Sequence, residues 1–392
     1  MKRILIANVG STSYKYTLFD ASADGSVCEL VRGGMDRVSD YDEAIKQSLV
    51  ELAQKGFDQS GIDAIAFKTV LGKNLSGLRE ADEEVLKALE DMSFVAPAHN
   101  PPYAAAIRAF GRVLPSARKV VLFETSFYQW ADKAWKRYAV PQSWHEIGIQ
   151  RNGFHGASHK FAAERAAELC GRADAAESAK MLYVNNAPMQ LEKPFRMVNC
   201  HLGGSSSVCG ILNGAAVGAS MGFTPQSGLP QNNRVGDLDA MAVPYAMATL
   251  NISAEEAMRQ LSKEGGLLGI SGVSNDMRDL ASASKQGNEN AQLAIDVLVY
   301  TTKAYIGQFM ATLGGIDAIS FSGGIAENNP WLREAILKSF EEFGLVVDEQ
   351  ANAQAVKKDA IISSENSKIK AVTVVANEEL VIVREAAKYL EK

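Results

Sequence analysis

Cysteine is scarce in this chain. Among 392 residues there are four cysteines, and no two of them have the C-x-x-C spacing of a metal-binding or redox motif. Four thiols are also too few for a disulfide scaffold in a chain of this length. We therefore expect reduced, mostly buried thiols and a cytoplasmic location. The cysteines are Cys28, Cys170, Cys200 and Cys209.

The sequence also lacks a basic excess and a long apolar run. Its 40 lysines and arginines against 46 acidic residues give a net charge of -6, which argues against a nucleic-acid-binding protein. No stretch reaches the roughly 18 apolar residues that cross a bilayer. The first apolar segment, residues 4–7, is too short for the core of a signal peptide. Nucleic acid and membranes are therefore not expected as partners.

Three short segments rich in glycine and hydroxyl residues stand out. Residues 8–13 follow an apolar strand, residues 154–159 read Phe-His-Gly-Ala-Ser-His, and residues 201–207 read His-Leu-Gly-Gly-Ser-Ser-Ser. Small residues let the backbone approach an anion closely, although an ordinary polar turn would use the same residues. None of the three matches the G-x-x-x-x-G-K-[ST] pattern of a P-loop. Three such turns in one chain indicate phosphate binding at several points and transfer of a phosphoryl group.

Length and pattern both predict two domains. A chain of 392 residues exceeds what one compact core usually holds. A strand–turn–strand unit occurs at residues 2–20 and again at residues 197–212. This weak repetition suits a duplicated α/β fold with one phosphate-binding hairpin in each half.

Apolar periodicity predicts the other main elements. Residues 171–193 show no clear pattern and are predicted to form an irregular surface insertion. The predicted helices are 41–56, 80–92, 103–113, 158–169, 289–313 and a last helix ending near 390. The predicted strands are 64–70, 119–123, 318–321 and 371–375.

Two longer motifs, Ser-Met-Gly-Phe-Thr-Pro at 220–225 and Gly-Leu-Leu-Gly-Ile-Ser-Gly-Val-Ser at 266–274, carry a family resemblance. With the shorter segments in order around them, the chain resembles the acetate kinase family of the acetate and sugar kinase/Hsp70/actin superfamily. The resemblance implies a duplicated actin-like (ribonuclease H-like) α/β fold with an interdomain active-site cleft. The expected domains are residues 1–149 and a nucleotide-binding domain of residues 150–379, with a C-terminal helix at 380–392 packing back on the first.

The resemblance also implies an activity. Members transfer a phosphoryl group from ATP to a short-chain carboxylate, acetate first, giving an acyl phosphate and ADP reversibly by direct in-line displacement. It implies ATP as donor, Mg²⁺ or Mn²⁺ as the metal, and a homodimer. Such a reaction needs cations around the phosphoryl oxygens, oxygen ligands for Mg²⁺ and a cation facing the acceptor carboxylate.

Matches to the family assign expected roles to individual residues. The expected catalytic residues are Lys68, Glu124, His155 and Arg234, and the expected metal residues are Asn8 and Glu378. The expected phosphate and nucleotide ligands are Ser11, Ser13, Lys15, His201, Gly203, Gly204, Asp276, Arg278, Gly324, Ile325 and Asn328. The expected acceptor pocket consists of Lys68, Val70, Ala98, Phe154 and Pro225.

Five positions depart from the family pattern. Lys68 stands in place of an arginine, which keeps the charge but loses the planar fork, and Glu124 stands in place of an aspartate, which displaces the carboxylate by one methylene. Tyr128 replaces histidine, and Gly204-Ser205 replaces Asn-Gly. Ala326 replaces a glycine where a side chain would narrow the adenosine pocket. Every charge expected in the catalytic centre is retained, so we expect an active, modified kinase.

The sequence leaves alternatives open. Ala98 stands where leucine is more usual, which would enlarge the acceptor pocket and favour propionate or butyrate. The changed turns would also suit pyrophosphate or another nucleotide as donor. A third reading is a catalytically weak regulator that binds a nucleotide or an acyl phosphate. His99, in His-Asn-Pro-Pro, fits a role in holding the turn as well as a catalytic one.

Overall fold

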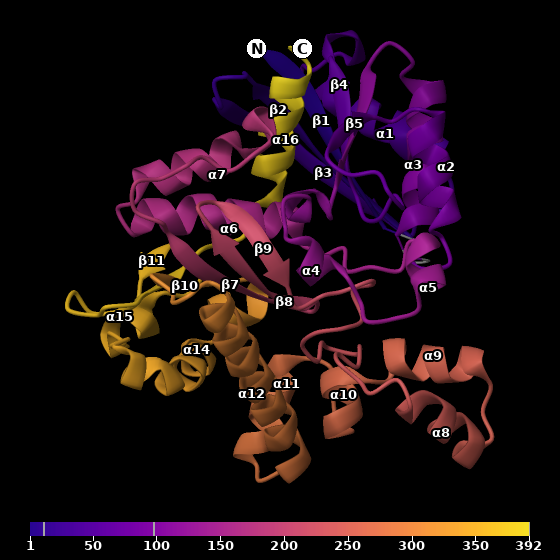
Figure 1. The fold of residues 1–392 in the computed structure, drawn as a ribbon. Helices are drawn as coiled ribbons and strands as arrows, with labels where there is room; N and C mark the ends of the chain where they lie inside the picture. Colours follow the sequence, from indigo (N-terminus) through magenta and orange to yellow (C-terminus); the bar gives the residue numbers. More distant parts are fainter. Residues whose placement is uncertain (11, 97–98, 392) are drawn as a thin grey trace.

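The computed structural model, which describes residues 1–10, 12–96 and 99–391, contains two six-stranded mixed sheets flanked by helices (Figure 1). The first sheet has the order β3-β2-β1-β4-β6-β5, and the second has the order β11-β12-β10-β7-β8-β9. The first consists of β1 (Lys2–Gly10), β2 (Ser13–Ala21), β3 (Val27–Asp36), β4 (Ala64–Thr69), β5 (Leu78–Glu80) and β6 (Arg118–Phe123). The second consists of β7 (Arg196–Leu202), β8 (Ser206–Leu212), β9 (Ala215–Ala219), β10 (Ala318–Ser322), β11 (Ala360–Ile361) and β12 (Lys370–Thr373).

The two sheets have the same topology. Each starts with three antiparallel strands, β1-β2-β3 or β7-β8-β9. Each then adds two parallel strands beside its first strand, β4 and β6 or β10 and β12, and ends with a short antiparallel edge strand. The repeat confirms the predicted duplicated α/β fold, because the two hairpins that were recognised in the sequence occupy equivalent places.

The helices of the first half cover its sheet. Leu5, Phe67 and Val121 from the strands pack with Leu49 of α1 and Phe110 of α3 in one fully or nearly fully buried core. Helix α2 starts at Glu83 rather than at the predicted residue 80, because residues 78–80 form β5 and Asp82 caps the helix. The helices are α1 (Tyr41–Gln54), α2 (Glu83–Asp91), α3 (Asn100–Val113) and the short α4 (Lys133–Lys136) and α5 (Gln142–Glu146), with 3₁₀ turns at Gln59–Gly61 and Ser126–Tyr128.

Two helices lead into the second half, and one of them corrects a prediction. Helix α6 (Gly156–Leu169) starts two residues before its predicted position. The segment predicted as an irregular insertion forms helix α7 (Ala173–Asn185), and Ala175, Ala179 and Leu182 on it are wholly buried. The prediction was wrong because alanine is only weakly apolar, so this helical stripe gives little periodic signal.

The second half carries the remaining helices. Helix α12 packs against β7 and β8 and contributes Ile306 and Phe309 to a second core (Figure 1). The helices are α8 (Ala242–Leu250), α9 (Ala254–Lys263), α10 (Gly266–Ser271), α11 (Met277–Lys285), α12 (Glu289–Thr312), α13 (Gly324–Asn328), α14 (Pro330–Leu337), α15 (Glu349–Gln354) and α16 (Glu378–Tyr389), with a 3₁₀ segment at Lys338–Phe343. No helix in residues 1–10, 12–96 and 99–391 is both long and apolar enough to cross a membrane.

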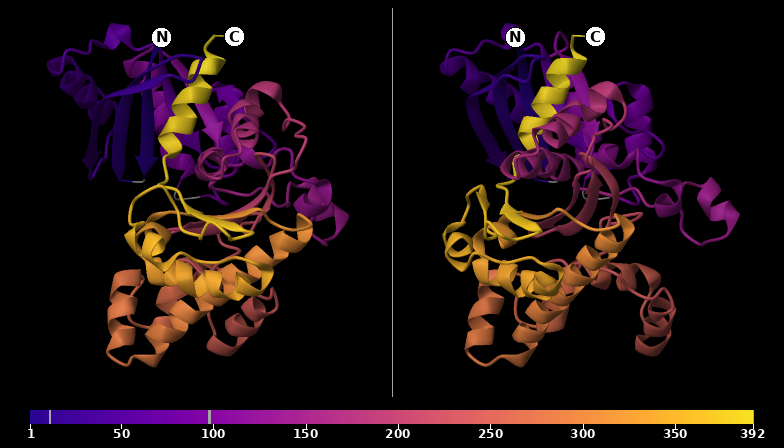
Figure 2. Two further views of the ribbon diagram at one scale, coloured as in Figure 1. Left: turned by 90° about the vertical axis from the view of Figure 1, so that its left-hand side faces the viewer. Right: turned by 60° about the vertical axis from the view of Figure 1, so that its left-hand side comes forward.

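The last helix returns to the first sheet. Val381, Ile382 and Ala386 of α16 are buried against Ile4, Ile6 and Ala66 of β1 and β4. Figures 1 and 2 show this helix beside the first strands, with the two chain ends close together. Helix α16 also packs on α6, which in turn contacts β7, β10 and β12. The α6–α16 pair therefore connects the two sheets, and it places Glu378 at the start of α16 between them.

Candidate active site

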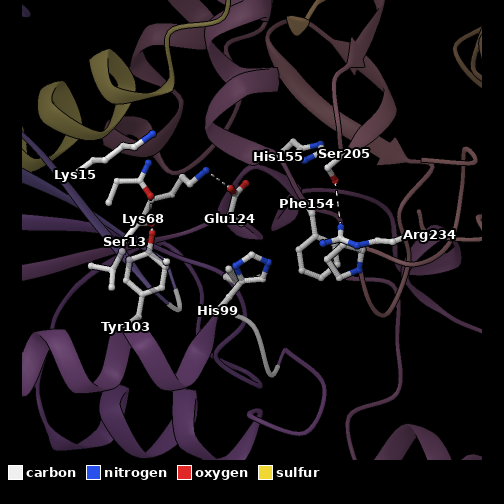
Figure 3. Close-up of a pocket in the computed structure, with 15 residues that line it drawn as sticks. Ser13, Lys15, Lys68, His99, Tyr103, Glu124, Phe154, His155, Ser205 and Arg234 are labelled. Carbon is white, nitrogen blue, oxygen red and sulfur yellow. Dashed lines mark hydrogen bonds and ion pairs between the residues drawn. The ribbon is translucent and has the colours of Figure 1, made fainter. Parts of the chain in front are cut away.

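A cavity of about 330 Å³ lies where the two halves meet (Figure 3). The first half lines it with the β1–β2 hairpin, the ends of β4 and β6 and the start of α3. The second half adds the segment before α6, the loop after β7 and a loop after β9. The described lining residues are Asn8, Val9, Gly10, Ser13, Lys15, Lys68, Val70, His99, Tyr103, Glu124, Phe154, His155, Ser205, Pro225 and Arg234.

Lys68 bridges two carboxylates at one side of the cavity. Its Nζ lies 2.8 Å from Glu124 Oε1 and 2.8 and 2.9 Å from the two carboxylate oxygens of Glu378. Burial alone would lower the pKa of Lys68, but the two carboxylates outweigh it and raise the pKa well above its ordinary value. Burial raises the pKa of Glu378, yet Lys68 reverses this and leaves it lowered. At neutral pH Lys68 is therefore a cation, and Glu378 is an anion paired with it.

Glu124 leaves one oxygen free for a further partner. Its Oε2 is buried and has no hydrogen-bond partner within the described residues. A buried carboxylate oxygen normally has one, and a hard cation such as Mg²⁺ would supply it. Asn8 adds an amide oxygen to the cavity wall, where the Tyr103 hydroxyl donates to it at 3.4 Å. The donors present therefore fit a magnesium ion that shares its remaining coordination with substrate oxygens and water.

Arg234 faces this group from the second half. Its Nη1 donates to Ser205 Oγ at 3.3 Å and to Gln231 Oε1 at 3.2 Å, and Ser205 Oγ donates to the same Gln231 oxygen at 2.8 Å. Burial lowers the pKa of Arg234, although a guanidinium stays charged in any case. Ser205, one of the predicted departures from the family pattern, thus helps to hold the arginine side chain at the cavity.

Three neutral histidines, His155, His159 and His201, lie together. The ring centroids of His155 and His201 are 4.7 Å apart, and those of His155 and His159 are 6.3 Å apart. Burial, aided by the neighbouring rings, lowers the pKa of His155 and of His159 well below the ordinary value. Burial also lowers the pKa of His201 to about 4. His155 itself has a left-handed backbone (φ 58°), a conformation that costs energy for a non-glycine residue and often marks a functional site.

An apolar wall closes one part of the cavity. Val70 and Phe154 are 8% and 2% exposed and pack with Leu71 and Met221, and Pro225 lines the cavity too. With Lys68, four of the five predicted acceptor-pocket residues line the same cavity. Two other predicted residues, Ser11 and Ala98, lie outside the described residues.

The predicted nucleotide ligands of the second half lie outside the described cavity lining, and several of them meet at one point. A Cβ atom on Gly323 would lie 2.6 Å from the carbonyl oxygen of Leu202, so only glycine allows this close approach. The contact places the start of α13, with Gly324 and Ile325, against the end of β7, which leads into Gly203 and Gly204, whereas Asn328 is the last residue of this short helix. His201 Nδ1 lies 3.1 Å from Ser322 Oγ at the same junction.

Asp276 and Arg278, the other two predicted nucleotide ligands of the second half, interact with each other at the start of α11. Asp276 caps α11, and its carboxylate pairs with Arg278, whose side chain is 87% exposed. The other two residues predicted to depart from the family pattern, Ala326 and Tyr128, are buried. The side chain of Ala326 is fully buried in the core of the second half rather than facing an open pocket, and Tyr128 is 1% exposed.

Tyr103 is the main lining residue that the sequence analysis missed. It lies four residues after His99, so the two share one face at the start of α3, where both line the cavity. Burial raises the pKa of Tyr103 to about 12 and lowers that of His99 to about 4, so both are neutral. The i, i+4 spacing from His99 was the available signal. Val9 and Gly10 were also missed, although they lie within the predicted hairpin.

The comparisons with known proteins agree with this geometry. The acetokinase family model matches residues 32–384. The chain is 38% identical to an acetate kinase of Caldicellulosiruptor saccharolyticus over the full length of both chains, and 34% identical to an acetate kinase of Bacillus subtilis over 99% of both.

Solved structures give the same result. An acetate kinase of Porphyromonas gingivalis aligns over 100% of both chains with a TM-score of 0.87 and 29% identity. A propionate kinase of Francisella tularensis aligns over 98% of this chain and 99% of its own with a TM-score of 0.82 and 27% identity. Family, fold and the charged interdomain cavity agree, and we conclude that the chain belongs to the acetokinase family, whose members are phosphotransferases with a carboxyl group as acceptor and ATP as donor.

Proposed function

We propose that this chain phosphorylates acetate with Mg-ATP, forming acetyl phosphate and ADP in a reversible reaction. The observation that carries the proposal is that cations from both halves, Lys15 and Lys68 on one side and Arg234 on the other, face one small cavity with an apolar wall (Figure 3). Phosphoryl transfer needs positive charge around the moving group, and a short carboxylate needs one cation and a small apolar enclosure.

The proposed step requires no general base. A carboxylic acid is ionised at neutral pH, so its oxygen attacks the γ-phosphorus directly. The new O–P bond forms as the bond to the bridging oxygen of ADP breaks, and ADP leaves with that electron pair. Glu124 is tied to Lys68 and the nearby histidines are neutral, which suits a reaction without proton transfer. Arg234 would hold the acceptor carboxylate and, with His155, the phosphoryl oxygens.

Other residues would bind the nucleotide and the metal. Ser13 and Lys15 on the first hairpin, with Gly203 and Gly204 on the second, would contact phosphates, and α13 would contact the nucleoside. Mg²⁺ would be held by Glu124 and Asn8, with Glu378 nearby, and would supply positive charge against the phosphate oxygens. Lys68 would then have two roles, because it neutralises the charge of Glu378 and also faces the acceptor carboxylate in the cavity.

The test is acyl phosphate formation trapped with hydroxylamine. Acetate, propionate and butyrate are compared as acceptors, and ATP and pyrophosphate as donors. Highest kcat/KM with acetate and ATP is expected. A preference for a longer acid or for pyrophosphate would overturn that specificity within the family. Thermal stabilisation by ATP without any product would indicate a binding protein without turnover.

The variant Arg234→Lys makes the test specific to the site. Lysine keeps the charge but loses the paired donors, so we expect kcat to fall about 100-fold. The matched control is Arg196→Lys, at a site near Asp317 away from the cavity. Equal activity of both variants would contradict the proposed role of Arg234.

We further propose that the chain forms a homodimer through α8. Every residue of α8 is at least partly exposed; its N-cap residue Met241 is 71% exposed, and Tyr245 and Leu250 within it are 73% and 61% exposed. Helices α8 and α9 stand out from the body of the molecule (Figures 1 and 2). Exposed apolar side chains gathered on one helix are typical of a protein interface. Light scattering of the native protein and of Tyr245→Glu tests this: the native protein should be a dimer and the variant a monomer.

A further inference from the structure

Asn199, in β7, lies at the inner end of a buried series of polar side chains. Its Nδ2 lies 2.8 Å from His159 Nδ1, and its Oδ1 accepts a hydrogen bond from Ser320 Oγ at 2.7 Å. His159 Nε2 lies 2.8 Å from Ser207 Oγ, which lies 2.8 Å from His155 Nδ1. Asn199, His159, Ser207 and Ser320 are all fully buried, so the series connects the core to the cavity without exposure to bulk water.

The series has a fixed direction because an amide nitrogen only donates. His159 Nδ1 is therefore an acceptor, and the proton of this neutral ring lies on Nε2. The Nε2–H of His159 donates to Ser207 Oγ, which leaves the hydroxyl hydrogen of Ser207 for His155 Nδ1. His155 then carries its own proton on Nε2, the ring nitrogen that remains for a ligand.

A branch of the same network reaches His201. Asn199 Nδ2 also lies 3.4 Å from Ser322 Oγ, and this hydroxyl lies 3.1 Å from His201 Nδ1. Ser322 Oγ accepts from Asn199, and His201 Nδ1 is the acceptor that the described side chains offer to its hydroxyl hydrogen, so His201 also keeps its proton on Nε2. One amide thus sets the tautomer of two rings whose centroids are 4.7 Å apart.

The tautomer has consequences because these rings are neutral. Burial lowers the pKa of all three histidines, and for His155 the rings of His201 and His159 and the cations Lys68 and Arg234 add to the effect. A neutral imidazole has a single N–H, so its placement decides whether the ring donates to a ligand or repels it.

We propose that Asn199, acting through His159 and Ser207, is a positioning residue that presents the Nε2–H of His155 to an anionic ligand in the cavity. The proposal rests on the phosphoryl-transfer function proposed above. With the Asn199 amide turned over, every hydrogen bond would reverse, and His155 would present a lone pair to the phosphoryl oxygens. The orientation of one buried amide therefore decides whether this ring stabilises or opposes the transferring group.

The native protein provides the first test. Long-range ¹H–¹⁵N NMR spectra of histidine-labelled protein distinguish the two tautomers directly, with assignments from His155→Gln, His159→Gln and His201→Gln. We expect the Nε2–H form for His155, His159 and His201. An Nδ1–H form at His155 would overturn the proposal. This readout does not depend on activity, so absence of kinase turnover together with the Nε2–H form would overturn the proposed function and still support the tautomer assignment.

The variant Ser207→Ala interrupts the series without touching the ligand. We expect His155 to become a mixture of tautomers and kcat to fall about 10- to 100-fold, with KM nearly unchanged. The matched control is Ser48→Ala in α1, which removes an equally buried hydroxyl that donates to Ile45 O at 2.7 Å. The control should lose similar stability but keep kcat and the tautomer. An unchanged tautomer and kcat in Ser207→Ala would overturn the proposal.

Discussion

Lys68 and Glu124 are both predicted departures from the family pattern, and in the structure they form an ion pair. A lysine side chain ends in a compact ammonium, whereas a glutamate reaches one methylene further than an aspartate. With this combination Lys68 Nζ lies 2.8 Å from Glu124 Oε1 and also contacts the carboxylate of Glu378. Both side chains are largely buried, at 18% and 6% exposed, so an imperfect fit would be costly. We interpret the two changes as one compensated exchange.

This interpretation predicts coupling between the two positions. Lys68→Arg alone should crowd the longer glutamate, and Glu124→Asp alone should pull the carboxylate away, so each should lower kcat about 10-fold or more. The double variant should recover activity, with a coupling of about 1 kcal/mol or more in a double-mutant cycle. Steady-state kinetics of the four proteins measures it. The exposed pair Lys46 and Glu43, also 2.8 Å apart, serves as a control and should show almost no coupling.

His159 makes stability depend on pH. Its pKa is lowered in the folded protein from an ordinary value of 6.5, because it is buried beside His201. Below pH 6.5 the unfolded chain binds a proton at His159 that the folded protein excludes. The contribution of His159 to the free energy of unfolding is therefore fully present above pH 6.5 and is lost as the pH falls below it. The free energy of unfolding should drop by up to about 1.4 kcal/mol per pH unit for this residue.

Urea unfolding at several pH values measures this slope. The variant His159→Gln removes the buried ring and should have a shallower slope than the native protein. Equal slopes in the native protein and in His159→Gln would contradict the assignment.

At the scale of elements, the segment between α5 and α6 depends on Tyr128. The Tyr128 hydroxyl donates to the carbonyl oxygen of Phe154 at 2.5 Å, and its ring stacks on Trp135 at 5.8 Å. A Cβ on Gly153 would lie 2.5 Å from the Tyr128 ring, so the segment lies directly on it. Tyr128 therefore supports the backbone that carries Phe154 and the left-handed His155 into the cavity.

Removing this hydroxyl should affect both stability and activity. Tyr128→Phe leaves the buried Phe154 carbonyl without its donor, which should cost about 1–3 kcal/mol of unfolding free energy and lower kcat. Denaturant titration and kinetics provide the two readouts. Tyr16→Phe is the control, because Tyr16 is equally buried and donates to Glu51 in the first half. It should lose stability without a matching loss of kcat.

At the scale of the whole molecule, buried charges join α6 to α16. Lys160 Nζ lies 2.6 Å from Glu164 and 3.2 Å from Glu385, and Arg384 also pairs with Glu164. Burial would raise the pKa of Glu164, but Lys160 and Arg384 together leave it lowered. Because α16 packs on the first sheet and α6 on the second, this network lies at the connection between them.

Removing only the cation of this network should lower the free energy of unfolding more than removing a cation together with its carboxylate partner. Lys160→Met should cost about 3 kcal/mol or more, since it leaves buried carboxylates undercompensated. The double variant Lys160→Met/Glu164→Leu should recover much of that loss. Lys46→Met on the surface should change stability by less than about 1 kcal/mol. Guanidinium unfolding measures all three, and a double variant less stable than Lys160→Met would contradict the explanation.

Local patterns in the sequence predicted the duplicated α/β fold, and the resemblance to the acetate kinase family supplied the charged residues of the cavity, such as Lys68, Glu124 and Arg234. Strand–turn–strand units and motifs such as residues 154–159 are local patterns, because hydrophobic periodicity and turn chemistry act over a few residues. The predicted domain boundary and the individual roles of the site residues remain predictions, as does the cytoplasmic location.

Which of these groups contact one another is a property of the folded chain. Lys68 and Glu378 are 310 residues apart in the chain, yet they form one ion pair, and a local pattern contains no information about such a contact. The direction of the Asn199 network likewise follows from four buried side chains on β7, α6, β8 and β10. Protonation, tautomer and charge depend on burial and on neighbours in space, and these exist only once the two sheets are brought together.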